Sequence, residues 1–257
     1  MTPELKPYVS CHTEHGITTI EFFHPQSNSL PGKLLEELAQ TIHSAGNDDD
    51  TRVIILRSAG TSTFCAGASF NELVSIQNEL EGLKFFSGFA NVINAMRKSR
   101  KLIIGRIHGK CVGGGVGLAA SVDYAIATDK ADVKLSELHV GIGPFVVGPV
   151  IERRIGSSAF SHLAIDASMW RNSDWGKRKG LYAEVHESIE NMDEAIERLS
   201  NTLAHYSPEA MTSMKKIFWK GTEHWDDLLK ERAAISGKLV LSDFTKKAIE
   251  KFKAKVL

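Results

Sequence analysis

A glycine-rich segment in the middle of the chain restricts the possible folds more than any other stretch. It reads "GKCVGGGVGLAASVDYAIA", from Gly109 to Ala127, and it places four glycines within the five residues 113–117. Glycine loses more conformational entropy on ordering than any other residue, so it is a poor choice inside packed structure unless something must approach the backbone closely. The apolar neighbours indicate that this approach occurs in the interior of the protein.

A nucleotide phosphate is the first group to consider. Gly115, Gly117 and Ala120 fit the dinucleotide pattern G-x-G-x-x-A, and Glu137 follows Gly117 by 20 residues. A dinucleotide-binding unit, however, needs a helix of about three turns between the glycines and the next strand, whereas strand-like residues begin here at Asp123. No G-K-[ST] follows the glycines either, and we therefore expect no nucleotide cofactor at this segment.

Two explanations of the glycines remain. Close packing of a short helix against a sheet would account for Gly113 and Gly117. Three adjacent glycines that open a helix also leave backbone N–H groups free, and such groups stabilise negative charge, as on an oxyanion. A second donor for that oxygen would come from "STFCAGASFNEL", where Ala66, Gly67 and Ala68 lie between a strand-like and a helix-like stretch. A plain loop is the simpler interpretation of those small residues on their own.

The composition excludes several classes of protein. The 257 residues include 31 Lys and Arg and 31 Asp and Glu, so no bulk charge favours a nucleic acid or an anionic membrane. The three cysteines lie far apart and the histidines show no metal-ligand spacing, which predicts reduced thiols and no metal site. Without an apolar run of about 18 residues, no transmembrane segment is expected. We expect a cytoplasmic protein.

Alternating strand-like and helix-like segments predict an α/β fold. A strand is expected at Ile17–Phe23, and apolar residues at helical spacing predict a helix over most of 71–99. From Asn191 onward the pattern is helical with short breaks. We therefore divide the chain into an α/β core, residues 1–200, and a C-terminal helical region, residues 201–257.

Four segments together resemble the crotonase family, the enoyl-CoA hydratase/isomerase superfamily. They are "FCAGASF", "GKCVGGGVGLAASVDYAIATDKADVKLSELHVGIGP", "GKRKGLYAEV" and "SPEAMTSMKKIF", and the resemblance extends over nearly the whole chain. It implies a spiral of β-β-α units that form two nearly perpendicular sheets, followed by a helical region that builds trimers. It also implies an acyl-CoA substrate, with coenzyme A as part of that substrate and no separate cofactor.

The resemblance also assigns roles to residues by their positions. The N–H groups of Ala68 and Gly114 are expected to form an oxyanion hole for the thioester carbonyl, so the group that approaches the glycines would be a thioester oxygen. Glu137 is expected to act as the acid and base. The other expected substrate-binding residues are Ala66, Gly67, Gly113, Gly115, Gly117, Pro144 and Lys253.

Three positions depart from the usual hydratase pattern. Gly117 stands where the best-known hydratases have a first glutamate, Ser69 stands where aspartate is common, and "PFVVGP", which begins at Pro144, replaces a glycine-rich stretch. This combination is similar to the subgroup of methylglutaconyl-CoA and carboxygeranoyl-CoA hydratases. The similarity implies a branched or carboxylated enoyl-CoA as substrate.

A single glutamate permits two reactions. It can deliver a proton to C2 while water adds at C3, which hydrates a 2-enoyl-CoA to a 3-hydroxyacyl-CoA through a stabilised enolate, and this is the reaction that we expect first. It can also move a proton between C2 and C4, as a Δ3,Δ2-enoyl-CoA isomerase does. A weakly active acyl-CoA-binding paralogue is the third possibility, because Gly117 removes half of the usual pair. Leu135, Leu138 and Val140 are apolar neighbours that predict a raised pKa for the Glu137 carboxyl.

The helical region has more apolar surface than so short a segment can cover by itself. Its apolar positions include Ile217, Phe218, Leu228, Leu229 and Ile235. We therefore expect self-association as a homotrimer or as a dimer of trimers.

Overall fold

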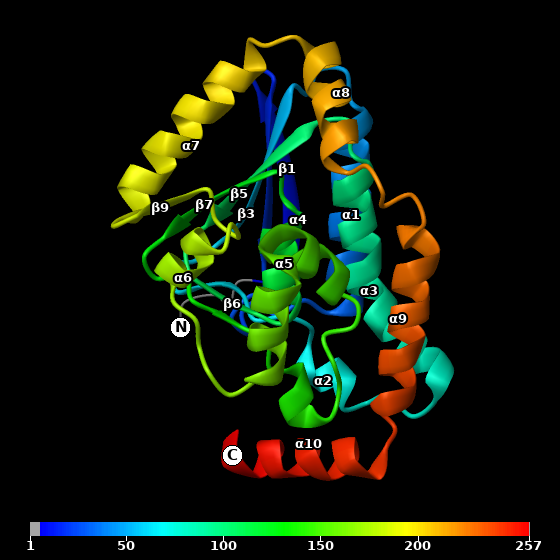
Figure 1. Cartoon of the computed structure of the whole chain (residues 1–257). Coiled ribbons are helices and arrows are strands. Elements are labelled where there is room, and N and C mark those ends of the chain that lie inside the picture. Colours follow the sequence, from blue (N-terminus) through cyan, green and yellow to red (C-terminus); the bar gives the residue numbers. More distant parts are fainter. Residues whose placement is uncertain (1–5, 257) are drawn as a thin grey trace.

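The computed structural model describes residues 6–256, with side chains up to Lys251, and shows a mixed α/β fold (Figure 1). An antiparallel hairpin opens it, in which β1 (Tyr8–Glu14) pairs with β2 (Ile17–Phe23). The strand β2 was expected from the sequence. The strand β1 was not, because its residues are half-buried or exposed and show no apolar alternation.

Two sheets form the centre of the molecule. The larger sheet has six strands in the order β1-β2-β3-β5-β7-β9, and all neighbours are parallel except β1 and β2. The smaller sheet has three parallel strands in the order β4-β6-β8. The strands after the hairpin are β3 (Val53–Ser58), β4 (Thr63–Cys65), β5 (Leu102–Ile107), β6 (Lys110–Val112), β7 (Tyr124–Thr128), β8 (Val133–Lys134) and β9 (Glu184–His186).

The chain alternates between the two sheets. Each of β3, β5 and β7 in the larger sheet is followed by β4, β6 and β8, respectively, in the smaller sheet, and a helix follows each pair. This repeated β-β-α unit is the spiral that the resemblance implies. The helices of this part are α1 (Gly32–Asn47), α2 (Phe70–Leu73), α3 (Glu79–Lys98), α4 (Gly114–Ser121), the 3₁₀-helix η1 (Glu137–Val140), α5 (Gly148–Ile165) and α6 (Ser173–Arg178).

The expected helix over 71–99 is two helices, α2 and α3, with a bend between them. Asn78 caps α3, because its side chain accepts a hydrogen bond of 3.0 Å from the Glu81 amide. Such a cap satisfies one of the N–H groups that have no partner within the helix, and it contributes about 1 kcal/mol. The cap therefore fixes where α3 begins.

Helices cover both faces of the larger sheet. Leu35 and Leu38 of α1 are buried in the main core cluster with Leu56 of β3. Val53 of the same strand is three positions before Leu56 and lies in a second cluster with Met192, because odd and even positions of a strand point to opposite faces of the sheet. Figure 1 shows α7 on one side of the sheet and α1 and α3 on the other.

Four helices end the chain: α7 (Ile189–Ala204), α8 (Pro208–Phe218), α9 (Trp225–Leu239) and α10 (Asp243–Val256). Residue 200, where we divided the chain, lies within α7. The helix α8 is attached to the core by Lys215, whose buried Nζ lies 2.8 Å from Oδ2 of Asp123. Trp219 donates a second hydrogen bond, of 3.0 Å, to Oδ1 of the same carboxylate.

The helix α9 lies along α3 (Figure 1). Two glycines permit this close approach, because a Cβ atom on Gly82 would lie 2.7 Å from the Cα atom of Gly237. The C-terminal helical region therefore completes one side of the same body that contains the two sheets.

Candidate active site

Two glycine-containing loops meet at the ends of neighbouring strands in the smaller sheet. The first follows β4 and the second follows β6, and Cys65 pairs with Cys111 in this sheet. Gly67 has φ of 88° and Gly113 has φ of 53°, a region that favours glycine because it has no Cβ atom. A Cβ atom on Gly67 would lie 3.4 Å from the Gly114 amide nitrogen. The two loops are therefore in contact.

The amides of Ala68 and Gly114 are free to bind an external acceptor. Ala68 forms a parallel bridge to Leu30, in which Leu30 donates to the Gly67 carbonyl and Ser69 donates to the Leu30 carbonyl. The Ala68 N–H points away from that bridge. Within the described part of the chain, neither the Ala68 amide nor the Gly114 amide donates a hydrogen bond.

A cavity of about 540 Å³ lies in front of these loops. It brings together most of the residues that the sequence predicts, namely Ala66, Gly67, Ala68, Gly113, Gly114, Glu137 and Pro144. Two predicted residues lie behind the lining: a Cβ atom on Gly115 would collide with the Cys65 carbonyl, and one on Gly117 would lie 2.6 Å from Val147 Cγ1. The side chain of Lys253 lies outside the described residues.

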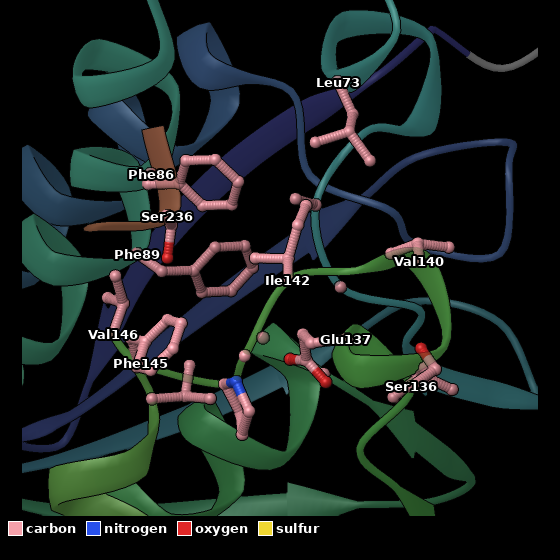
Figure 2. Close-up of a pocket in the computed structure, with 18 of the residues that line it drawn as sticks. Leu73, Phe86, Phe89, Ser136, Glu137, Val140, Ile142, Phe145, Val146 and Ser236 are labelled. Atoms are coloured by element: carbon pink, nitrogen blue, oxygen red, sulfur yellow. The ribbon is translucent and has the colours of Figure 1, made fainter. Parts of the chain in front are cut away.

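Glu137 is the first residue of η1, and its carboxyl lies at the glycine loop (Figure 2). The Oε1 atom would be 2.9 Å from a Cβ atom on Gly113. The Oε2 atom is buried and has no hydrogen-bond partner among the described residues. Burial raises the pKa of this carboxyl to about 7, and interaction with the backbone of Glu137 and Ser136 offsets part of the rise. The predicted direction of the pKa shift is confirmed.

At Gly117, where the best-known hydratases have a first glutamate, the side chain of Val147 occupies the neighbouring space. Gly117 lies in α4, every residue of which is buried, and Val147 covers it. The other ionisable residues that line the cavity are Lys134 and His139. Among the described lining residues, Glu137 is therefore the one carboxylate.

Several lining residues were not predicted as part of a site. Phe86 and Phe89 fit the helical pattern of α3, but spacing alone does not distinguish a side chain in the core from one in a cavity wall. Phe145 lies in the "PFVVGP" stretch, and Ser236 comes from α9, about 100 residues after Glu137. No local sequence signal connects Ser236 to the glycine loops.

Other chemistries have little support in this structure. Burial raises the pKa of the Cys65 thiol to about 12, so it is not an activated nucleophile. Among the side chains that the structure describes, no group of three or more His, Cys, Asp or Glu is arranged to hold a metal ion. Within residues 6–256, no helix combines the length and the apolar character needed to cross a membrane.

The β-β-α spiral places the chain among proteins of the crotonase fold. The crystal structure of an enoyl-CoA hydratase from Bacillus halodurans matches it with a TM-score of 0.88 at 22% sequence identity, over 95% of this chain and 99% of that one. The sequence adds a closer relation. The chain belongs to the enoyl-CoA hydratase/isomerase family, whose model matches residues 12–255.

Named relatives are similar over most of the chain. The short-chain-enoyl-CoA hydratase of Clostridium acetobutylicum is 28% identical over 212 residues, which are 82% of this chain and 80% of that protein. The mitochondrial methylglutaconyl-CoA hydratase of Mus musculus is 29% identical over 189 residues, which are 73% of this chain and 60% of that protein. The chain is therefore an enzyme of a family that hydrates or isomerises acyl-CoA thioesters.

Proposed function

We propose that the chain is a Δ3,Δ2-enoyl-CoA isomerase in which Glu137 transfers the proton. The main support is one buried carboxyl with a pKa of about 7 beside two amides that have no acceptor within the described chain. A carboxyl with a pKa near the working pH serves well both as a base and as an acid. Isomerisation needs both roles from one group, in succession.

The reaction follows from this arrangement. The thioester oxygen accepts hydrogen bonds from the Ala68 and Gly114 amides, and the Glu137 carboxylate takes a proton from C2. The electron pair delocalises over the thioester and the neighbouring double bond, and the amides stabilise the resulting negative charge on oxygen. The carboxyl then returns the proton to C4, so the double bond moves from C3–C4 to C2–C3. No atom is gained or lost.

The cavity wall supports a reaction without added water. Val147 occupies the space beside Gly117, and most of the side chains that line the cavity are apolar. Exclusion of water keeps the transferred proton on the carboxyl instead of exchanging it with solvent. Isomerisation needs only the thioester and the chain's own groups, and hydration needs one water molecule in addition. We therefore propose that coenzyme A enters as part of the substrate and that no separate cofactor is used.

Hydration, the reaction that the sequence favours first, is the second candidate. The hydratase names of the relatives from Clostridium acetobutylicum and Mus musculus support it. In this reaction a protonated Glu137 would deliver its proton to C2 while water adds at C3, and another group would have to orient that water. His139 and Lys134 line the same cavity and are the candidates for this task.

Absorbance of the conjugated thioester distinguishes these proposals. Incubation with a 3-enoyl-CoA should produce conjugation if the chain is an isomerase, and incubation with a 2-enoyl-CoA should leave the conjugation unchanged. Loss of conjugation from the 2-enoyl-CoA would instead establish hydration. Binding without any spectral change would identify a weakly active paralogue and refute both reactions.

A further inference from the structure

The cavity has two differently lined ends. Figure 2 shows Phe86, Phe89 and Phe145 on one side of Glu137, and Ser136 and Val140 on the other. The charged lining residue Lys134 and the ionisable His139 are near neighbours of Ser136 and Val140 in the chain. The ionisable residues Lys134 and His139 therefore belong to one end of the cavity, and the other end is aromatic except for the hydroxyl of Ser236.

We name the aromatic end the aromatic arm and define it by Phe85, Phe86, Phe89, Phe145 and Val146. The rings of Phe85 and Phe86 are perpendicular, with their centroids 5.0 Å apart, an arrangement that aromatic pairs prefer. The ring of Phe89 is buried and touches Gly114, because a Cβ atom there would collide with it. The aromatic arm therefore begins directly beside the amide that is proposed to bind the thioester oxygen.

Ser236 of α9 contributes to the wall of the cavity at the aromatic arm. It is 1% exposed and lies beside Phe86 and Phe89 (Figure 2). Its position is fixed by the neighbouring residue Gly237, which packs against Gly82 of α3. The close contact between α3 and α9 thus holds Ser236 in the cavity wall.

We propose that the aromatic arm binds an uncharged medium-length or branched acyl chain and excludes acyl groups that end in a carboxylate. The proposal rests on the proposed function, which places the thioester at Ala68 and Gly114. A carboxylate in the arm would lose its hydration without gaining a cationic partner, since no residue that defines the arm is charged. Of the branched and carboxylated substrates that the sequence resemblance implies, only the uncharged branched ones fit this arm.

Binding of unreactive thioesters tests this proposal without any turnover. Octanoyl-CoA and the mono-CoA thioester of octanedioic acid differ only at the end of the chain, where the latter has a carboxylate. Isothermal titration at neutral pH should give an affinity for octanoyl-CoA at least about 100-fold higher, because a buried carboxylate without a partner is strongly unfavourable. Equal affinities, or tighter binding of the carboxylated thioester, would overturn the proposal.

A variant in the wall of the arm tests where the acyl chain binds. Ser236→Leu fills the space beside Phe86, so octanoyl-CoA should bind about 10-fold more weakly while acetyl-CoA binding changes by less than about 3-fold. Ala234→Leu is the matched control, because Ala234 lies on the same helix but is exposed and does not line the cavity. If Ser236→Leu fails to fold, Phe86→Ala should show the same selective loss of octanoyl-CoA affinity. Unchanged octanoyl-CoA affinity in a folded variant would show that the chain lies elsewhere.

The outcomes also separate this proposal from the proposed function. If octanoyl-CoA is preferred but 3-octenoyl-CoA is not isomerised, the isomerase assignment fails and the aromatic arm stands. If 3-octenoyl-CoA is isomerised but octanoyl-CoA does not bind more tightly than its carboxylated analogue, the isomerase assignment stands and the proposal for the aromatic arm fails. Absence of binding by either thioester would overturn both.

Discussion

The raised pKa of the buried Glu137 carboxyl determines how the reaction rate should depend on pH. Its pKa is raised from 4.5 to about 7, and isomerisation begins with the ionised form, which removes a proton from C2. We therefore expect kcat/KM for a 3-enoyl-CoA to rise as the pH increases through about 7 and then to level off. Initial rates measured over about pH 5.5–9 would check this, and a fall above pH 7 would indicate instead that the protonated form is the active one.

Replacement of this carboxyl should separate catalysis from binding. Glu137→Gln keeps the size of the side chain but cannot exchange a proton, so turnover should fall by about 100-fold or more. Affinity for an unreactive acyl-CoA should stay almost unchanged, as measured by titration calorimetry. Activity within a few-fold of the unmodified enzyme would contradict the role of Glu137.

The same pKa makes a prediction about stability. The folded protein holds the Glu137 proton more tightly than the unfolded chain does. The resulting contribution to the free energy of unfolding is fully present below about pH 4.5 and is lost as the pH rises through about 7. The loss is on the order of 3 kcal/mol for a shift of this size. Glu137→Gln has no such proton, so its free energy of unfolding should lack this loss between pH 5 and pH 8. The difference in stability between the two proteins, measured by denaturant unfolding, should therefore shift in favour of the variant at pH 8. Parallel pH dependence in both proteins would refute the shift.

The oxyanion hole is tested through a backbone atom. Ala68→Pro removes the amide that is proposed to donate, and it breaks no hydrogen bond donated within the described chain. Loss of one such donor typically costs about 10²–10³-fold in turnover. Ala68→Ser retains the N–H and serves as the control. A folded proline variant with almost normal turnover would show that the oxygen is bound elsewhere.

At the scale of elements, the stability of the protein should be sensitive to added side-chain volume where α3 and α9 meet. A Cβ atom on Gly237 would lie 2.8 Å from the Leu83 amide nitrogen, so Gly237→Ala should force the helices apart at a cost of about 1–3 kcal/mol. The better helix propensity of alanine returns about 1 kcal/mol, which offsets only part of that cost. Urea unfolding should therefore give a lower midpoint for Gly237→Ala. Lys238→Ala, at an exposed position on α9, should change stability by less than about 0.5 kcal/mol.

The elements also show what could be learned from the sequence. The glycines of residues 113–117 stand out in the sequence by themselves, whereas the roles of Ala68 and Glu137 were predicted from the family resemblance. The edge strand β1 has no local signature, because most of its side chains face solvent. The aromatic arm and Ser236 depend on where α3 and α9 meet, and that distance follows from tertiary packing of Gly82 against Gly237, which no local pattern encodes.

For the whole molecule, the exposed face of α8 is the main reason to expect self-association. Met214, Ile217 and Phe218 are exposed there by 46%, 69% and 48%, whereas Leu229 of α9 is fully buried within the chain. The apolar surface predicted from the sequence is thus partly covered by the protein itself. An exposed apolar cluster of this kind favours contact with another copy.

We therefore predict a homotrimer or a dimer of trimers. Sedimentation at micromolar concentration should give a mass three or six times that of the 28.2 kDa chain. Ile217→Lys should weaken the assembly, because it places a charge in the proposed interface, while the far-UV circular dichroism stays unchanged. A monomer at that concentration would contradict the prediction.

The helix α9 is synthesised long after α3, the helix on which it packs. Both glycine loops and Glu137 lie within residues 63–148, but the helix with Ser236 is made almost 80 residues later. Until α9 emerges from the ribosome, the cavity lacks the part of its wall that Ser236 supplies. The face of α3 on which α9 packs therefore stays uncovered until late in synthesis, and the cavity wall is complete only once α9 has folded onto α3.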